Sequence, residues 1–173
     1  MGILICGLNG VGKSTIGRML AERLSWRFID NEDLFFPKDD LNYLFSHPRK
    51  REEVITLLEE AVTKDKRYVF TAVRGDYGSV FLATIEKAVL IEVPRELRLQ
   101  RVYDRSFARF GERMLAGGDL FERESAFLEQ VRSRPEDHVT SWLNDTGISV
   151  IRVDGTLPPE ENVDSLIKRL GSR

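Results

Sequence analysis

A glycine-rich segment near the N-terminus has the residue types and the spacing of a phosphate-binding loop. Gly7-Leu8-Asn9-Gly10-Val11-Gly12-Lys13-Ser14 matches the pattern G-x-x-x-x-G-K-[ST] at every fixed position. Glycine allows backbone conformations that other residues avoid, so successive N–H groups can point at one anion. The segment predicts a site for the phosphates of a nucleoside triphosphate; the alternative is an ordinary glycine-rich turn closed by a serine.

Each residue of this loop has a predicted role. The backbone amides that surround the phosphates are those of Asn9, Gly10, Val11 and Gly12. Lys13 is expected to reach the β- and γ-phosphates, where it also takes part in catalysis. The Ser14 hydroxyl is expected to hold Mg²⁺, and Thr15 to contact the α-phosphate.

Missing motifs exclude two classes of phosphate-loop protein. The sequence contains neither N-K-x-D nor D-x-x-G, which a GTPase needs to read guanine and the γ-phosphate. The apolar run that ends in Thr71-Ala72-Val73-Arg74 has no following Asp-Glu pair, as a motor ATPase requires. A small phosphotransferase remains.

A stripe of arginines follows Pro94 at spacings of three and four residues. It consists of Arg95, Arg98, Arg101, Arg105, Arg109 and Arg113. On a continuous helix these residues share about one third of the circumference. Arginine binds phosphate oxygens through two parallel hydrogen bonds, so we expect Arg105 and Arg109 beside the transferring phosphate. Arg101 and Arg113 support them, and the first two arginines lie in solvent; the alternative is a solvated charged face.

The elements that position these residues alternate between short apolar runs and amphipathic stretches. Strands are expected at 3–6, 27–30, 68–73, 88–93 and 148–153. Helices are expected at 13–24, 49–64, 75–84, 95–110, 120–133, 136–143 and 159–170. This order predicts an α/β three-layer sandwich with a five-stranded parallel sheet.

Length and composition predict one globular domain. The 173 residues are 42% apolar and 31% charged, so we expect a single domain over 1–173 with a helical lid inserted at about 105–134. Gly111 is expected to break the arginine helix, and Gly117-Gly118 to act as a hinge. One cysteine and two histidines exclude a disulfide framework and a zinc cluster.

Charge and hydropathy limit the partners. A net charge of −2 gives no field that attracts nucleic acid, and no apolar run approaches the roughly 18 residues of a membrane span. The N-terminus lacks the basic lead of a signal peptide, so we expect a cytoplasmic protein without a membrane partner. A monomer and a dimer remain equally compatible with the sequence.

The chain resembles the small P-loop kinases of the adenylate kinase and shikimate kinase group. The resemblance rests on the loop 7–15, on Phe28-Ile29-Asp30, on the segment 88–105 and on Val153-Asp154-Gly155-Thr156. It implies that Asp154 and Thr156 lie beside the adenine of ATP. The chain also resembles a bacterial group of AAA-family ATPases. The Gly-Gly-Gly of shikimate kinases and the Gly-Phe-Pro-Arg of adenylate kinases are absent, so the acceptor stays open.

Acidic residues follow the second apolar run. Asp30 stands where the resemblance implies the first carboxylate of a D-x-D pair, and Glu32 and Asp33 follow. A hydroxyl that attacks a phosphate needs a carboxylate to orient it, so Asp30 and Asp33 are the candidates, Asp30 also for Mg²⁺ and Asp33 for the acceptor. The alternative is that residues 31–33 only cap the next helix.

These observations predict transfer of the γ-phosphate of Mg·ATP to a small molecule, either a nucleotide or a hydroxylated metabolite. Arg74 ends a buried strand at the edge where open α/β sheets bind ligands, and is expected to contact the acceptor or a phosphate. Two alternatives remain open: a regulatory protein that binds ATP and hydrolyses it slowly, and an RNA-associated kinase or ATPase.

Overall fold

The computed structural model describes residues 1–171 and contains one five-stranded parallel sheet. Its strands are β1 (Gly2–Cys6), β2 (Arg27–Asp30), β3 (Tyr68–Thr71), β4 (Ile85–Glu92) and β5 (Val150–Asp154). The spatial order is β2-β3-β1-β4-β5, and every neighbouring pair is parallel. The carboxyl ends of all five strands therefore meet at one edge of the sheet.

Helices fill the connections between these strands. They are α1 (Lys13–Leu24), α2 (Asn31–Phe35), α3 (Arg51–Lys64), α4 (Ser79–Leu82), α5 (Arg95–Phe110), the 3-10 helix η1 (Gly111–Met114), α6 (Phe121–Ser133), α7 (His138–Thr146) and α8 (Pro159–Gly171). None of the helices within residues 1–171 is long and apolar enough to span a membrane.

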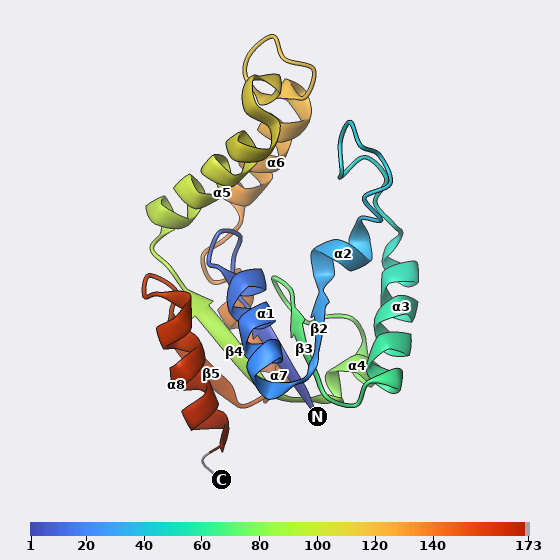
Figure 1. Ribbon diagram of the computed structural model, residues 1–173, viewed down its shortest axis with the longest axis vertical. Coiled ribbons are helices and arrows are strands. Elements are labelled where there is room, and N and C mark those ends of the chain that lie inside the picture. The colour runs from blue at the N-terminus through green and yellow to red at the C-terminus, as the bar shows by residue number, and fades with distance from the viewer. Residues whose placement is uncertain (172–173) are drawn as a thin grey trace.

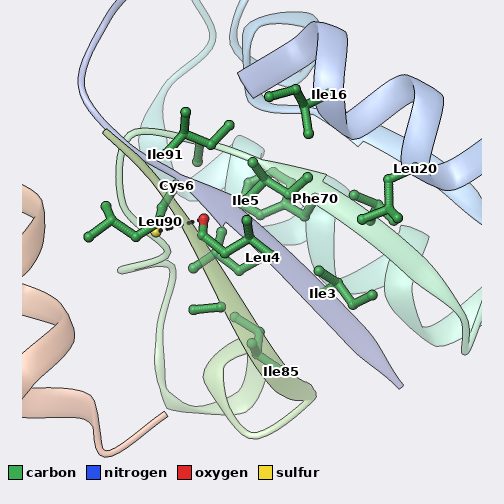
Figure 2. Packing of buried hydrophobic residues seen from close by; sticks show 14 of the residues in the cluster. Ile3, Leu4, Ile5, Cys6, Ile16, Leu20, Phe70, Ile85, Leu90 and Ile91 are labelled. Atoms are coloured by element: carbon green, nitrogen blue, oxygen red, sulfur yellow. Dashed lines mark hydrogen bonds between the residues drawn. The ribbon is translucent and has the colours of Figure 1, made fainter. Parts of the chain in front are cut away.

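The core lies on both faces of the central strand β1, which is buried along its whole length (Figure 2). Ile16 and Leu20 of α1 pack over one face of the sheet (Figure 2). On the other face Phe70 contacts Phe81 of α4 edge to face, with ring centroids 5.2 Å apart. Helices on both faces make the predicted three-layer sandwich, and the apolar residues on both faces of β1 are the physical reason for it.

A helical hairpin stands above the carboxyl edge of the sheet (Figure 1). Helices α5 and α6 run side by side and are joined at the top through η1 and the loop around Gly117 (Figure 1). Helix α5 ends at Phe110, where Gly111 has φ +57°, so the expected helix break is confirmed. We name residues 95–133 the α5–α6 hairpin.

The structure differs from the expected elements mainly at their ends. Strand β3 stops at Thr71 instead of residue 73, and the helix expected over 75–84 is only the single turn α4. Residues 31–33 form the first turn of helix α2 and do not cap it; the capping side chain is that of Asp30, whose Oδ1 accepts a hydrogen bond from the Glu32 amide at 3.0 Å. A short side chain in an extended backbone conformation suits this capping position.

Candidate active site

The loop between β1 and α1 has the backbone conformation that its glycines predict. Gly10 and Gly12 adopt φ values of +85° and +95°, which L side chains rarely reach. A Cβ atom on Gly10 would also stand 2.2 Å from the carbonyl oxygen of Arg98, so the loop packs directly against the base of α5. Gly12 is therefore required for its backbone conformation, and Gly10 both for its conformation and for the close packing.

The N-terminus of α1 is prepared to bind an anion. No side chain caps the helix, and its first turn contains no acidic residue. The first amides of a helix lack partners within the helix and carry positive partial charge, so they attract phosphate. Ser14 and Thr15 are exposed in this first turn.

The Lys13 side chain folds back over the loop. Its Nζ donates a hydrogen bond to the Leu8 carbonyl oxygen at 2.9 Å. Burial, and after it the positive charge of Arg105, lowers the pKa of Lys13 to about 8. Both effects disfavour the charged ammonium, so a bound anion beside Lys13 would raise this pKa again.

A cavity of about 360 Å³ opens in front of this loop. Its phosphate end is lined by Asn9, Gly10, Lys13 and Ser14. Its other end, which we name the aromatic chamber, is lined by Phe35, Phe36, Tyr43, Phe45, Phe127 and Glu124. Asp30, Arg105 and Arg109 line the same cavity, so the structure brings the loop, the Asp30 carboxylate and two arginines of the stripe together.

The acidic residues after β2 separate into two groups. Asp30 and Glu32 line the cavity, whereas Asp33 does not. The Asp33 carboxylate accepts a hydrogen bond from Lys38 Nζ at 2.5 Å and lies at a second hollow, formed with α3. Asp30 precedes α2 in an extended backbone conformation, whereas Asp33 lies within the helix, on the side that faces Lys38 and α3. The structure therefore does not bring Asp33 to the proposed site of chemistry.

The arginine stripe separates in the same way along α5. Arg105 and Arg109 line the cavity, and the Arg109 guanidinium lies 5.0 Å from the centre of the Phe45 ring. The expectation that the first two arginines lie in solvent is wrong for Arg98, whose side chain is 1% exposed and pairs with Glu136. The base of α5 packs against the segment after α6, so this part of the stripe faces protein instead of water.

Two other arginines of the stripe contact backbone. Arg101 Nη1 donates to the Gly155 carbonyl oxygen at 2.9 Å, which fixes the loop after β5. A Cβ on Gly155 would lie 2.9 Å from the Val11 carbonyl oxygen, so this loop lies beside the phosphate loop. Arg113 donates to Asp119 and to the Asn42 carbonyl oxygen, and thereby ties the tip of the α5–α6 hairpin to the 36–50 segment.

The remaining predicted residues lie outside the cavity. Asp154 accepts hydrogen bonds from the Thr156 amide and hydroxyl, at 2.8 and 2.6 Å, and both residues line a shallow hollow beside Val93. Arg74 pairs with Asp76 at 2.8 Å and is half-buried after β3.

Cys6, next to the loop, is fully buried, and burial raises the pKa of its thiol to about 12, which fits a packing role (Figure 2).

Sequence reasoning missed two charged residues at the site. Arg134 donates to Asn9 Oδ1 at 2.5 Å, and it follows α6, well outside the arginine stripe, so no spacing indicated it. Glu124 is 1% exposed and lines the aromatic chamber. A signal for Glu124 did exist: with Leu120, Leu128 and Val131 it occupies one apolar face of α6.

The residues present fit Mg·ATP. Within residues 1–171 no three His, Cys, Asp or Glu side chains form a ready-made metal site. Mg²⁺ does not require one, because it commonly binds one or two protein oxygens together with phosphates and water. The exposed Ser14 hydroxyl and the free Oδ2 of Asp30 are two such oxygens at one cavity.

Comparison with known proteins agrees with this arrangement. The sequence pattern of the AAA domain matches residues 3–109, from β1 to the second half of α5. The chain belongs to the AAA domain family. This member of the AAA domain family is 29% identical over 183 residues to the uncharacterized protein YqaC of Bacillus subtilis, which covers 98% of this chain and 97% of YqaC.

Solved structures place this AAA domain among the small P-loop kinases in fold. The shikimate kinase of Acinetobacter baumannii in complex with shikimate superposes with a TM-score of 0.60 at 21% identity, over 98% of this chain and 92% of that one. The deoxyadenosine kinase of M. mycoides superposes with a TM-score of 0.59 at 14% identity over the whole of both chains. The predicted resemblance to the adenylate and shikimate kinase group is confirmed.

Proposed function

We propose that the protein is an ATP-dependent phosphotransferase that moves the γ-phosphate of Mg·ATP to a small-molecule acceptor. The observation that carries the proposal is the shared cavity of about 360 Å³, in which Lys13, Ser14, Asp30, Arg105 and Arg109 line the same space as the aromatic chamber. A nucleotide and a hydroxylated metabolite are the acceptor classes that follow from the sequence.

The residues of the cavity can divide the reaction between them. The acceptor oxygen forms a bond to the γ-phosphorus, the bond from that phosphorus to the bridging oxygen of ADP breaks, and the hydroxyl proton goes to Asp30. Lys13, Arg105 and Arg109 stabilise the negative charge on the transferring oxygens. Mg²⁺, held by Ser14 and Asp30, would neutralise charge on the β- and γ-phosphates.

Two further features support the proposal. The structural relatives include a shikimate kinase and a deoxyadenosine kinase, whose names describe phosphate transfer to small molecules. The α5–α6 hairpin stands above the carboxyl edge of the sheet (Figure 1), and Arg105 and Arg109 of α5 line the cavity. We propose that residues 105–134 act as a lid that excludes water around the bound phosphates. We propose that Asp154 and Thr156 lie beside adenine. Arg101 and Thr15 would support the nucleotide, and Arg74 would contact the acceptor or a phosphate.

The test is transfer of label from γ-labelled ATP to a panel of nucleosides, nucleotides, sugars and short RNA. We expect label in one small acceptor, at a rate well above that of label released as free phosphate. Lys13→Ala should abolish the transfer, and Lys66→Ala, a change at an exposed lysine, should leave it unchanged. Release of free phosphate alone would contradict the proposal and favour a regulatory protein that hydrolyses ATP.

A further inference from the structure

Two buried polar atoms at the cavity lack a hydrogen-bond partner in the described chain. They are Oε2 of Glu124 and Oγ1 of Thr71, and both residues line the cavity in front of the phosphate loop. The other carboxylate oxygen of Glu124 accepts a hydrogen bond from the Tyr43 hydroxyl at 2.8 Å. Buried polar atoms are almost always paired, and a carboxylate oxygen without a donor is particularly costly. Glu124 is therefore suited to receive a donor from a ligand.

Glu124 has no direct cationic partner in the described chain, although Arg109 and Arg123 lie over the neighbouring rings of Phe45 and Tyr43. It forms no ion pair within residues 1–171, although its side chain is almost completely buried. Burial and the hydrogen bond to Glu124 raise the pKa of Tyr43, so that its hydroxyl stays a donor to Oε1 and leaves Oε2 open. A buried carboxylate held in this way is more stable with a second donor or a cation beside it.

The walls around Glu124 are aromatic. Phe36 and Phe45 meet edge to face with ring centroids 5.0 Å apart, and Tyr43 meets Phe45 in the same way at 5.7 Å. Phe35 and Phe127 complete the lining of the chamber. Such walls bind a flat or apolar ring, and the few polar groups among them set its orientation.

The charges of the cavity are unevenly divided. Of its three cations, Lys13 and Arg105 influence each other at the phosphate end. The third, Arg109, lies over the Phe45 ring and 4.0 Å from the Glu32 carboxylate, between the two ends of the cavity. The chamber itself holds Glu124, which would repel an acceptor that carries a carboxylate or a phosphate.

We infer that the phosphate acceptor is a ring-bearing alcohol, neutral or cationic, which donates an N–H or O–H hydrogen bond to Glu124. Its ring lies against Phe36 and Phe45, and its hydroxyl group points to Asp30 and the phosphate end. Acidic acceptors are disfavoured, which narrows the acceptor classes considered above to those without a charged acidic group. This inference rests on the proposed phosphotransferase function.

The experiment compares acceptors and Glu124 variants. Adenosine, cytidine and thymidine serve as neutral rings, glucosamine as a cationic ring, and shikimate, gluconate and AMP as acidic probes. With the parent protein we expect the best neutral or cationic probe to exceed every acidic probe at least tenfold in kcat/KM. Preferred transfer to an acidic probe would overturn the inference and leave the proposed phosphotransferase function intact.

Glu124→Gln keeps the size of the side chain and an acceptor for Tyr43 while it removes the charge. We expect the KM of the best acceptor to rise about tenfold to a hundredfold, the range of a lost charged hydrogen bond, with the KM of ATP within twofold. The exposed Glu122→Gln on the same helix is the matched control and should change neither value. An unchanged acceptor KM in Glu124→Gln would mean that Glu124 only links α6 to Tyr43, and would overturn the inference.

Two further measurements separate the possible failures. If Glu124→Gln does not fold, Glu124→Asp, which keeps the charge but shortens its reach, takes its place with the same expected rise in acceptor KM. If no probe receives label, the proposed function fails, and calorimetric binding of the same probes in the presence of a non-hydrolysable ATP analogue decides the inference separately. The inference is supported if the parent protein binds a neutral or cationic ring and the Glu124 variant does not. The inference is overturned if the parent protein binds only acidic probes or no probe.

Discussion

The phosphate end of the cavity comes from one continuous segment, whereas the aromatic chamber comes from three segments that are far apart in the sequence. Asn9, Gly10, Lys13 and Ser14 lie within six residues of one another, between a buried strand and a helix. The chamber combines α2 with the residues after it, the 43–45 region and the inner face of α6. A local motif fixes its own geometry through backbone conformation, but a chamber built from distant segments depends on how those segments pack.

The two ends also differ in what holds them in place. The phosphate loop rests on the main core through the fully buried strand β1. On the chamber side, Tyr43 is part of a small second cluster with Phe110, Met114 and Leu120, and Phe45 packs against it, so this cluster joins the 36–50 segment to the α5–α6 hairpin. Phe35 packs against the main core. We therefore expect changes at the phosphate end to affect catalysis strongly, and changes at the chamber to affect acceptor choice more than rate.

The largest effect is expected at the acidic residues between the two ends. Asp30→Asn should lower kcat at least about a hundredfold, because it removes the carboxylate that accepts the hydroxyl proton. Asparagine caps helices as well as aspartate does, so α2 should remain folded. Asp33→Asn, which changes a carboxylate outside the cavity, should lower kcat less than about threefold. Equal losses in both variants, measured by steady-state kinetics, would remove the distinction that the structure draws between these residues.

The arginine stripe offers a second matched pair. Arg105→Ala should lower kcat by about thirtyfold to a hundredfold, because a cation beside the transferring phosphate is lost. Arg95→Ala changes an arginine of the same helix that bonds to Glu136 and to the Arg132 carbonyl oxygen, and should lower the midpoint of thermal unfolding with little change in kcat. The prediction is contradicted if Arg95→Ala costs as much activity as Arg105→Ala.

Much of the fold could be predicted from sequence because its signals are local. The five apolar runs, the glycine loop and the break at Gly111 each depend on neighbouring residues, and each appears at or near the expected place. The position of Arg98 could not be predicted, because its burial depends on Glu136, which lies 38 residues away. Asp33 failed as a cavity residue for a similar reason: the extent of α2 decides the direction of its side chain.

The site could be predicted less completely than the fold. Lys13, Ser14 and Asp30 lie where the motif and the second apolar run placed them. Phe35, Phe36 and Tyr43 belong to no motif, yet all three line the cavity. Aromatic residues have the same sequence pattern in a core and in a binding chamber, and only the tertiary arrangement separates the two.

A third prediction concerns pH at the phosphate end. The pKa of Lys13 is about 8 in the unliganded protein, below the usual 10.5, so the amine loses its proton as the pH rises through 8. Binding of ATP restores the charged form, and near pH 8.5 it should take up roughly three quarters of a proton. The affinity for ATP should fall by up to about tenfold per pH unit above 8.

Titration calorimetry in buffers of different ionisation enthalpy measures this proton uptake. At pH 6.5 Lys13 is already charged before ATP binds, so this group should contribute almost no uptake, which serves as the internal control. The same shift implies that, between pH 8 and 10.5, the unfolded chain holds a proton that the folded chain has lost. The Lys13 contribution to the free energy of unfolding of the unliganded protein should therefore increase with pH in this range. Uptake that does not depend on pH would contradict the role of Lys13.

The smallest effect is expected in the aromatic chamber. Phe45→Leu should raise the acceptor KM about threefold to tenfold, because it removes one ring of the wall but keeps an apolar side chain. The dissociation constant of ATP should stay within twofold. Phe107→Leu, at an exposed aromatic residue of α5, is the control. A larger change in ATP binding than in acceptor KM would show that the two ends of the cavity are not separate.

Nucleotide-dependent thermal stabilisation of the parent protein and of Lys13→Ala tests the central claim most directly, because it asks only whether the loop at residues 7–15 binds a triphosphate. At an ATP concentration of about one hundred times the dissociation constant, the parent should gain about 2.7 kcal/mol of stability, or roughly 5–10 °C in the unfolding midpoint. Lys13→Ala should show little or no increase at the same concentration. Equal stabilisation of both proteins would contradict the assignment of the phosphate site.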